Sequence, residues 1–384
     1  MGTELIRMGR DHSWIFIRPD ALEALHNDVI KRALRWYYAV LLDNYPAKFM
    51  IAKRVAVEER FDRLDMEALW DLHREKAREF ESLWSEVRRE GKTFDEFDRE
   101  YRVAEPNLID LKAFIARKLV ERCRLCERRC GVKRLEGEIG FCRVDGRTYV
   151  HSWFLHLGEE APLVPSGTIF YGGCNFACVY CQNWDISQEN PRGGVVVDAR
   201  RLALMQKELA LKGARNINHV GGDPIPHLHT IMESLKYLDV NIAQLWNSNF
   251  YMTMESLELL IHVMDIWLPD FKYGNNECAL RLSKAPRYVD IVLRNLQVAV
   301  EWGDMIIRHL VLPNHVECCT KRVLEMIASS LPKDRVLVNI MDQYRPEYHA
   351  YEYKDIARRP KPRELEEAYE YADRLGILWR EVSR

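Results

Sequence analysis

The sequence predicts an α/β protein in which a parallel sheet follows a helical region and a small cysteine-rich segment. The first observation is an alternation of short apolar runs with helical patterns, repeated five times after about residue 166. The second is that most of these runs are apolar throughout, as in strands covered on both faces. The third is a set of polar residues directly after the runs, at the ends of the expected strands. These observations predict a partial barrel or an open doubly wound sheet.

The composition is that of a globular protein of two or three domains. The 384 residues are 47% hydrophobic and 30% charged, with a net charge of −2. This small charge gives no bulk attraction for nucleic acids or acidic membranes, and no apolar run reaches the about 18 residues of a membrane span. The start of the chain lacks the apolar core of a signal peptide. Seven of the ten cysteines fall in two tight clusters, which indicates metal chemistry in a reducing compartment. We therefore expect a cytoplasmic protein without a membrane or nucleic-acid partner.

Residues 1–120 are expected to form a helical N-terminal extension. Residues 20–36 begin with an aspartate that can cap a helix, and their apolar positions recur at intervals of mostly three and four. A longer helical stretch over residues 61–91 ends at a glycine, a common residue after a helix. Residues 93–96 have the form of a capping box, and residues 108–119 form a further amphipathic segment. The sequence does not indicate a function for this extension.

Residues 121–165 are expected to bind a metal through Cys123, Cys126, Cys130 and Cys142. Three of these cysteines are close together in the chain, and neighbouring glycines permit tight turns. Four thiolates of this kind hold either a tetrahedral zinc ion or a [4Fe–4S] cluster. Structural zinc is the simpler interpretation because four protein ligands leave no open coordination position, and an auxiliary electron-transfer cluster is the alternative.

The α/β core is expected over residues 166–345, followed by a helical C-terminal tail over residues 346–384. The expected strands are residues 168–171, 216–220, 243–246, 266–269, 305–312 and 335–340. The helical patterns between them are residues 199–212, 226–238, 255–263, 286–302 and 321–331.

A second cysteine motif follows the first expected strand. Cys174, Cys178 and Cys181 have the spacing C-x₃-C-x₂-C and are preceded by two glycines. Three thiolates on so short a loop can bind three irons of a [4Fe–4S] cluster, which leaves the fourth iron open to another ligand. A structural zinc site needs a fourth protein ligand, and none follows at a usual offset.

Polar residues also follow the other strands, and parallel strands bring such residues to one rim. Each group is a weak signal alone, and their coincidence with the three-cysteine loop gives them weight. The groups are Gly221-Gly222-Asp223-Pro224, Asn247-Ser248-Asn249, Asp270-Phe271-Lys272, Arg308 within the fifth strand, and residues 342–345 after the sixth.

This arrangement resembles the radical S-adenosylmethionine (SAM) superfamily, and within it the pyruvate formate-lyase activating enzymes and their relatives. The resemblance covers roughly residues 120–345 and rests on Cys174, Cys178, Cys181, Tyr180, the Gly-Gly-Asp-Pro segment 221–224, Asp270 to Lys272 and the strand of Arg308. It implies a partial (β/α)₆ barrel of the TIM type. It also implies an oxidoreductase that binds a [4Fe–4S] cluster and SAM and cleaves SAM reductively to a 5′-deoxyadenosyl radical.

The resemblance further implies roles for individual residues. The three cysteines bind the cluster, and the backbone of Gly221 and Gly222 approaches the methionyl amine of SAM, whose ammonium Asp223 helps to hold. Tyr180 lies against the adenine or packs in the loop, and Lys272 and Arg308 suit the carboxylate or ribose of SAM. Asn247 and Asp270 complete the expected cofactor-binding set. Asn247-Ser248-Asn249-Phe250 replaces the Asp-Thr-Asn-Gly of the activating enzymes, so we do not expect their cation site here.

The expected function is hydrogen abstraction from a protein or peptide substrate, with a reductant such as a ferredoxin or flavodoxin. One alternative is a radical SAM enzyme that acts on a small molecule or modifies a protein side chain. An alternative of another class is a non-catalytic iron–sulfur or zinc protein. The sequence assigns no acid, base or second radical residue, and the remaining cysteines, Cys278 and the pair Cys318-Cys319, are expected to pack in or beside helices.

Overall fold

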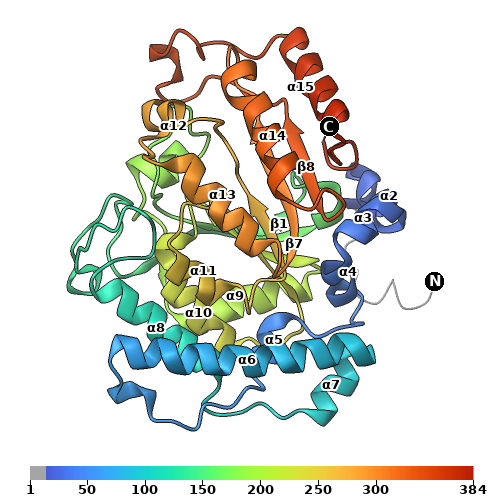
Figure 1. The fold of residues 1–384 in the computed structure, drawn as a ribbon. Helices are drawn as coiled ribbons and strands as arrows, with labels where there is room; N and C mark the ends of the chain where they lie inside the picture. The colour runs from blue at the N-terminus through green and yellow to red at the C-terminus, as the bar shows by residue number, and fades with distance from the viewer. Residues whose placement is uncertain (1–13, 384) are drawn as a thin grey trace.

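Six parallel strands form the centre of the protein, with helices around them (Figure 1). They pair side by side in the order in which they occur in the chain. The structure is a computed structural model that describes residues 14–383. A doubly wound sheet reverses its strand order at a switch point, and this sheet does not. The strands are β2 (Ser166–Tyr171), β4 (Asn216–Gly221), β5 (Ala243–Ser248), β6 (Ile266–Pro269), β7 (Asp304–Leu310) and β8 (Val336–Met341).

Two antiparallel strands extend the sheet at one edge. Strand β1 (Thr148–His156) pairs with β2, and β3 (Val195–Val197) pairs with β1. Among the strands within residues 14–383, β8 pairs only with β7 and β3 only with β1, so the sheet is not closed. A single parallel bridge joins Leu337 of β8 to Leu378 of the C-terminal segment. The predicted partial barrel is therefore confirmed, and the two antiparallel strands are an addition. Strand β1 mixes polar and apolar residues, and β3 is a run of only 3 residues that is mostly exposed, so neither resembles the buried apolar runs of the parallel strands.

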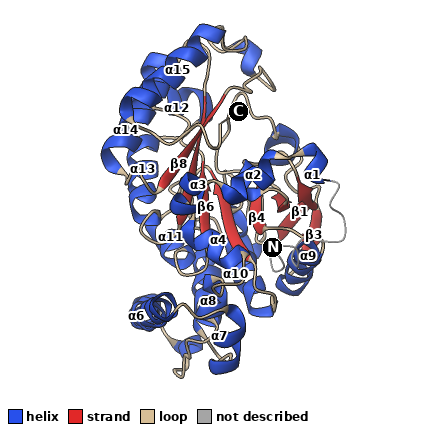
Figure 2. Cartoon of the chain, turned by 90° about the vertical axis from the view of Figure 1, so that its right-hand side faces the viewer, coloured by secondary structure: helices blue, strands red, loops and turns tan. Residues whose placement is uncertain are grey.

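Helices connect the parallel strands and flank the sheet (Figure 2). The five helical patterns expected between the strands are all present, and one short helix, α12, is additional. The connecting helices are α9 (Ala199–Leu211), α10 (Leu228–Tyr237), α11 (Met254–Leu260), α12 (Asn276–Ser283), α13 (Tyr288–Ala299) and α14 (Lys321–Ser330), and α15 (Pro362–Leu375) follows the last strand.

The N-terminal extension is helical throughout its regular structure, but its first part is more broken than the sequence predicts. The single helix expected over residues 20–36 is divided among α2 (Asp20–His26), α3 (Asp28–Ala33) and α4 (Arg35–Leu41). At the first break, Asn27 has an extended backbone, and its side chain accepts hydrogen bonds from the amides of Val29 and Ile30. An asparagine at this position starts a new helix, and the apolar periodicity did not reveal it.

The later helices of the extension agree with the prediction. Helix α6 (Met66–Glu90) ends at Gly91 with φ 68°, and a capping box starts α7 (Phe94–Glu100). Helix α8 (Leu108–Glu121) completes a layer with α6 and α7 at one end of the molecule (Figures 1 and 2). The other short helices of this region are α1 (Trp14–Ile17) and α5 (Lys48–Ala52).

The extension is attached to the amino-terminal ends of the strands. The indole nitrogen of Trp36 donates to the carboxylate of Asp265, just before β6, over 2.8 Å. The backbone amide of Tyr37 donates to the carboxylate of Asp304, the first residue of β7, over 2.7 Å. The amino end of the sheet is thus covered, and the carboxyl end, where parallel α/β folds carry their sites, stays available. No described helix has both the length and the apolar character needed to cross a bilayer.

Candidate functional site

The three-cysteine loop begins directly after β2, at the carboxyl end of the sheet. Cys174 and Cys178 are buried and Cys181 is partly exposed. Each sulfur has a polar neighbour: the amide of Phe176 donates to Cys174 over 3.3 Å, the hydroxyl of Ser283 donates to Cys178 over 2.9 Å, and the hydroxyl of Ser187 lies 3.3 Å from the sulfur of Cys181. Hydrogen bonds of this kind tune thiolates that bind iron–sulfur clusters.

Burial strongly affects the ionisation of these three thiols. It raises the pKa of all three thiols, that of Cys178 to about 11, although the charge of Lys272 opposes the effect at Cys178 and Cys181. The thiolate is the form that binds a metal. A cationic metal centre is therefore the group that would stabilise three thiolates in this loop.

Two glycines at the carboxyl end of β4, Gly221 and Gly222, allow the backbone to approach the loop closely. A Cβ atom on Gly221 would lie 2.2 Å from backbone atoms of Tyr171, and Gly221 has φ 123°. A Cβ atom on Gly222 would lie 2.1 Å from the carbonyl oxygen of Gly173. The amide of Gly222 donates to Tyr171 over 2.8 Å and that of Asp223 to Gly173 over 2.9 Å. Only glycines fit this junction, which fixes the segment 221–223 against the cysteine loop.

Asp223 is buried beside the loop and forms no ion pair within residues 14–383. Its carboxylate accepts hydrogen bonds of 3.0 Å from the amides of Ile225 and Asn249. Burial raises the pKa of Asp223 to about 7 despite these bonds. Asn249 in turn donates through its side chain to Asn175 over 2.6 Å and contacts the sulfur of Cys174 at 3.7 Å. A bound cation would stabilise this carboxylate.

Lys272 and Asp270 form an ion pair of 2.6 Å at the end of β6. Burial alone would lower the pKa of Lys272, but the carboxylate of Asp270 and the thiols of Cys178 and Cys181 together raise it. Lys272 is therefore a cation close to two of the three cysteines.

Arg308 lies in a buried cluster of charged and amide side chains. Its guanidinium pairs with Glu159 and, over 2.7 Å, with Glu160. Burial would raise the pKa of Glu159, but the charge of Arg308 and the ring of His156 outweigh it and lower the pKa to about 2. Both glutamates are buried.

The same cluster joins several strands. Asn218 of β4 donates to Glu159 over 2.9 Å, and Asn339 of β8 donates to Glu160 over 2.7 Å. The side-chain oxygen of Asn247 in β5 accepts from Arg308 over 3.5 Å. The side-chain nitrogen of Asn247 is buried and has no partner among the described residues. An unpaired buried amide is costly, so this nitrogen is a donor available to a ligand.

Tyr180 is buried, and its hydroxyl lies 2.7 Å from that of Tyr273. The hydroxyl of Tyr273 lies 2.5 Å from that of Ser283, which donates to Cys178. Tyr180 therefore begins a chain of hydroxyl groups that ends on a cysteine sulfur. Its ring packs edge-on against Tyr344, which is the packing alternative that the sequence left open.

The predicted cofactor-binding residues thus fall into two neighbouring groups rather than one. Gly221, Gly222, Asp223 and Lys272 lie at the three-cysteine loop, while Arg308 and Asn247 lie in the buried cluster with the glutamates. The loop and its surroundings supply three thiols with hydrogen-bond donors, a glycine cradle and an unpaired carboxylate, and the buried cluster supplies the amide donor of Asn247. These residues fit a [4Fe–4S] cluster with an amino-acid ligand on the open iron.

Sequence reasoning missed Ser283, Asn218 and Asn339. Ser283 lies more than a hundred residues after Cys178 in the chain and ends helix α12, which was not predicted. No local sequence signal therefore marks it. The two asparagines occupy interior positions of β4 and β8, where a polar residue in an apolar strand was the available signal.

The second cysteine segment forms a cavity next to this loop. Cys123, Cys126, Cys130 and Cys142 all line it, together with Arg128, Arg134, Phe141 and Asn175. Hydrogen bonding with Cys130 lowers the pKa of the Cys123 thiol, an effect that burial opposes and Arg134 supports. None of the four belongs to a set of three or more described ligands whose atoms lie within 4.8 Å of one another.

The two cysteine groups are connected. Arg128 donates to the carbonyl oxygen of Asn175 over 2.9 Å, and Asn175 also lines the second cavity. Because Asn175 is the neighbour of Cys174 in the chain, the two groups share one wall.

Comparison with known proteins gives a consistent family. The family model of the radical SAM superfamily matches residues 168–327. "Uncharacterized protein MJ0674" of Methanocaldococcus jannaschii is 46% identical over 347 residues, which are 89% of this chain and 97% of that protein.

Solved structures are more distant. A crystal structure of Streptococcus suis SuiB bound to the precursor peptide SuiA has a TM-score of 0.40 and 11% identity, and it covers 56% of this chain and 47% of that one. A domain of a pyruvate-formate lyase-activating enzyme from Bacteroides vulgatus has a TM-score of 0.34 and 16% identity, with 43% of this chain and 96% of that one covered.

Proposed function

Because this chain belongs to the radical SAM superfamily, we propose that it is an enzyme that cleaves SAM reductively and abstracts a hydrogen atom from a protein or peptide. The proposed reaction class follows from membership of this superfamily. The observation that favours a large substrate is the open sheet, since β8 and β3 are not paired with each other within residues 14–383. On this proposal, a peptide segment reaches the carboxyl ends of the strands between the edges of β8 and β3, past the C-terminal residues Leu378 and Ser383 that contact β8.

The protein's part in this reaction is to bind, orient and shield. When bound, the [4Fe–4S] cluster and SAM supply the electron transfer and the 5′-deoxyadenosyl radical. Cys174, Cys178 and Cys181 would provide three thiolates, and the glycine cradle would bring backbone groups to the fourth position. Asp223 would hold the ammonium of the methionyl group, and a cation there would keep its carboxylate ionised.

The cationic groups suit the anionic and polar parts of the same ligand. Lys272 lies by the cysteines and would meet the carboxylate of SAM, while the free amide of Asn247 would donate to a polar group deeper in the barrel. Arg308 already pairs with two buried glutamates, so its role would be to hold those carboxylates in place.

A second iron–sulfur cluster on Cys123, Cys126, Cys130 and Cys142 is the interpretation that we favour over zinc. The wall that the cavity shares with the three-cysteine loop supports it. A cluster there would pass electrons from an external one-electron donor, such as a ferredoxin or flavodoxin, to the first cluster.

The reaction class is tested by reconstituting the full chain anaerobically and reducing it with SAM present. The product 5′-deoxyadenosine is expected from the wild type, and none from Cys178→Ala. Iron content gives an independent readout, because the variant should lose about four irons per chain. A wild-type protein that carries the cluster and leaves SAM intact would contradict the proposal.

The substrate class is tested by growing candidate partner proteins in deuterated medium. Deuterium in the 5′-deoxyadenosine after incubation with a partner, together with a glycyl radical detected by paramagnetic resonance, would support the activating-enzyme role. Deuterium transfer only from a labelled small-molecule extract would show that the substrate is a small molecule and not a protein.

The metal of the second cysteine segment is tested separately. Counting iron and zinc in Cys126→Ala and in the wild type identifies which metal the segment binds.

A further inference from the structure

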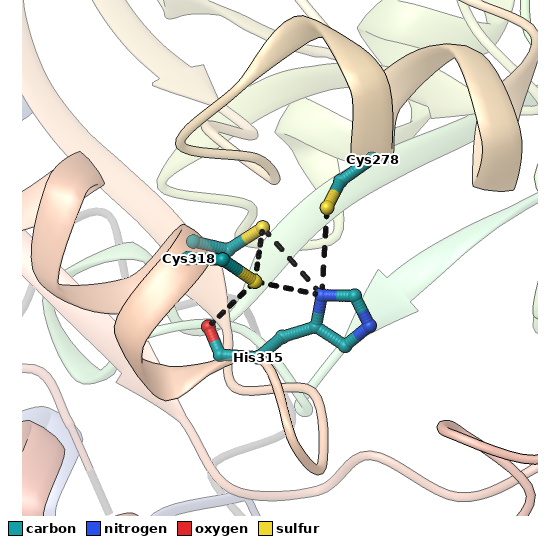
Figure 3. A group of neighbouring side chains, drawn as sticks. Cys278, His315 and Cys318 are labelled. Atoms are coloured by element: carbon teal, nitrogen blue, oxygen red, sulfur yellow. Dashed lines mark hydrogen bonds between the residues drawn. The ribbon is translucent and has the colours of Figure 1, made fainter.

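Three further cysteines and a histidine meet at a place that the proposed reaction does not use. Cys278 lies in the first turn of α12, and Cys318 and Cys319 lie in the π-helical turn Val316–Thr320 before α14. His315 directly precedes that turn. Figure 3 shows the sulfurs of Cys278 and Cys318 directed toward the same ring nitrogen of His315, from two different elements.

The four ligand atoms form a compact set. The Nδ1 atom of His315 lies 3.3 Å from the sulfur of Cys318 and 3.7 Å from that of Cys278. It also lies 3.7 Å from the sulfur of Cys319, and the sulfurs of Cys318 and Cys319 are 3.9 Å apart. All four atoms lie within 4.8 Å of one another, and theirs is the one such group found in residues 14–383.

These distances are those of a single tetrahedral ion. With zinc–sulfur bonds of about 2.3 Å and zinc–nitrogen bonds of about 2.0 Å, the edges of the tetrahedron are about 3.8 Å between sulfurs and about 3.6 Å between sulfur and nitrogen. A [4Fe–4S] cluster binds each thiolate to a different iron and therefore needs wider spacing. Three thiolates and one imidazole, with no fourth position left open, are a structural zinc ligand set.

The histidine is oriented as a metal ligand usually is. Its other ring nitrogen, Nε2, lies 3.0 Å from the carboxylate of Asp355, which fixes Nδ1 toward the cysteines. Asp355 is itself held by Arg281 of α12 through a contact of 3.2 Å. His315 and Cys319 are buried, so this arrangement is built into the fold rather than formed by exposed side chains.

Asn275 supports the thiols from a second side. Its side-chain nitrogen lies 3.3 Å from the sulfur of Cys278 and 3.8 Å from that of Cys319. The same side chain caps α12 by accepting from the amide of Cys278 over 2.8 Å. Donors aimed at sulfur favour the thiolate form.

We propose that Cys278, Cys318, Cys319 and His315 bind one zinc ion as a structural site. Binding releases one proton from each of the three thiols, and the nearby guanidinium of Arg281 offsets the negative charge that results. The ion would join α12 to the segment before α14. Cys278 and His315, the first ligands from the two elements, are 37 positions apart in the chain.

Helix α12 connects this site to the three-cysteine loop. Ser283, which donates to the sulfur of Cys178, lies at the other end of the same helix. The backbone of Leu282 and Ser283 also accepts from the amides of Val179 and Ala177 in the three-cysteine loop. Zinc at the first turn of α12 would therefore fix the helix that supports the loop.

The first test counts zinc and iron by mass spectrometry in the full-length protein purified without chelators. Cys278→Ser and His315→Ala are each expected to contain one zinc per chain less than the wild type, at unchanged iron content. His349→Ala, an exposed histidine bonded to Glu352, is the matched control and should keep its zinc. Equal zinc in the wild type and in both variants would overturn the site.

Two further measurements do not depend on variants that lose a ligand. Asp355→Asn keeps all four ligands and should bind zinc about 10–100-fold more weakly, measured by competition with a chelator. In the wild type, Cys278 and Cys318 should resist alkylation until a chelator removes the ion. Rapid alkylation of the untreated protein, or a disulfide between these cysteines in anaerobically prepared protein, would refute the proposal.

Discussion

At the scale of single residues, a hydroxyl group from a distant helix forms a hydrogen bond with the three-cysteine loop. The hydroxyl of Ser283 lies within hydrogen-bond distance of the hydroxyl of Tyr273 and donates a hydrogen bond to the sulfur of Cys178. A hydrogen bond to a charged acceptor is worth about 1.5–3 kcal/mol, more than one between neutral groups. Because the reduced cluster carries more negative charge, this bond should favour reduction.

Ser283→Ala is therefore expected to lower the reduction potential of the cluster. A loss of about 1.4 kcal/mol corresponds to about 60 mV for one electron. The potential is measured by redox titration followed with paramagnetic resonance. Ser329→Ala, an exposed serine on α14, makes the same chemical change away from any cysteine and should leave the potential unchanged. An unchanged potential in Ser283→Ala would show that the bond does not tune the cluster.

Lys48 is a second residue whose environment predicts a measurable effect. It is fully buried, and its ammonium donates to the carbonyl oxygens of Ile261 (3.3 Å) and Met264 (3.0 Å). Burial lowers the pKa of Lys48 to about 8, even though Asp265 and Asp304 raise it. Because the folded pKa is below the unfolded value of 10.5, the unfolded chain holds this proton more tightly.

The free energy of unfolding should therefore contain a contribution from Lys48 that is complete above about pH 10.5 and is lost as the pH falls to about 8. Its size is up to about 3 kcal/mol. Between about pH 8 and pH 10.5, the free energy of unfolding of Lys48→Met should increase less steeply with pH than that of the wild type. Urea unfolding at several pH values measures this. The exposed Lys31→Met serves as the control. Parallel pH curves for the wild type and Lys48→Met would contradict the assignment.

At the scale of elements, the junction between β4 and the three-cysteine loop depends on backbone contact. Gly222 touches Gly173 so closely that a single methyl group would collide with backbone, which cannot move aside as a side chain can. Gly222→Ala should displace the loop, reduce cluster binding by at least about tenfold and cost about 2 kcal/mol or more of stability.

Iron content and urea unfolding check this prediction together. Gly91→Ala is the control, since Gly91 has φ 68° and nothing within 4 Å of its added Cβ. It should cost about 1 kcal/mol from backbone strain and leave iron binding intact. A Gly222→Ala protein with full iron content would show that the loop tolerates the displacement.

At the scale of the whole molecule, the N-terminal helices act as a cover for the amino ends of the strands. Asp265 joins the two parts by accepting from the indole of Trp36 over 2.8 Å and the amide of Lys48 over 3.0 Å. It also accepts from the amide of Gln244 over 2.8 Å, within the sheet. One buried carboxylate thus satisfies donors from both parts of the chain.

Asp265→Ala should destabilise the protein by about 3 kcal/mol or more, because several buried donors lose their acceptor. Limited proteolysis should then release the N-terminal helices before the sheet is cut. Asp239→Ala removes an exposed ion pair with Lys207 and should cost less than about 1 kcal/mol. Simultaneous loss of both parts in the protease digest would show that they unfold as one unit.

The order and type of the core elements could be read from the sequence. The six parallel strands and five connecting helices follow from local apolar patterns, because strands covered on both faces must be apolar throughout. The helix ends at Gly91 and Thr93 were predictable for the same reason, since capping depends on residues within a few positions.

The sequence by itself also indicated the superfamily, because the three-cysteine loop and the residues around it resemble the radical SAM proteins. The short spacing C-x₃-C-x₂-C is enough to bring three thiols onto one loop. Only the tertiary structure placed Ser283 on Cys178, buried Glu159 and Glu160 against Arg308, and joined Cys278 to His315. These contacts link residues that are tens to more than a hundred positions apart. Their partners are fixed by the packing of whole strands and helices, and no local pattern contains that information.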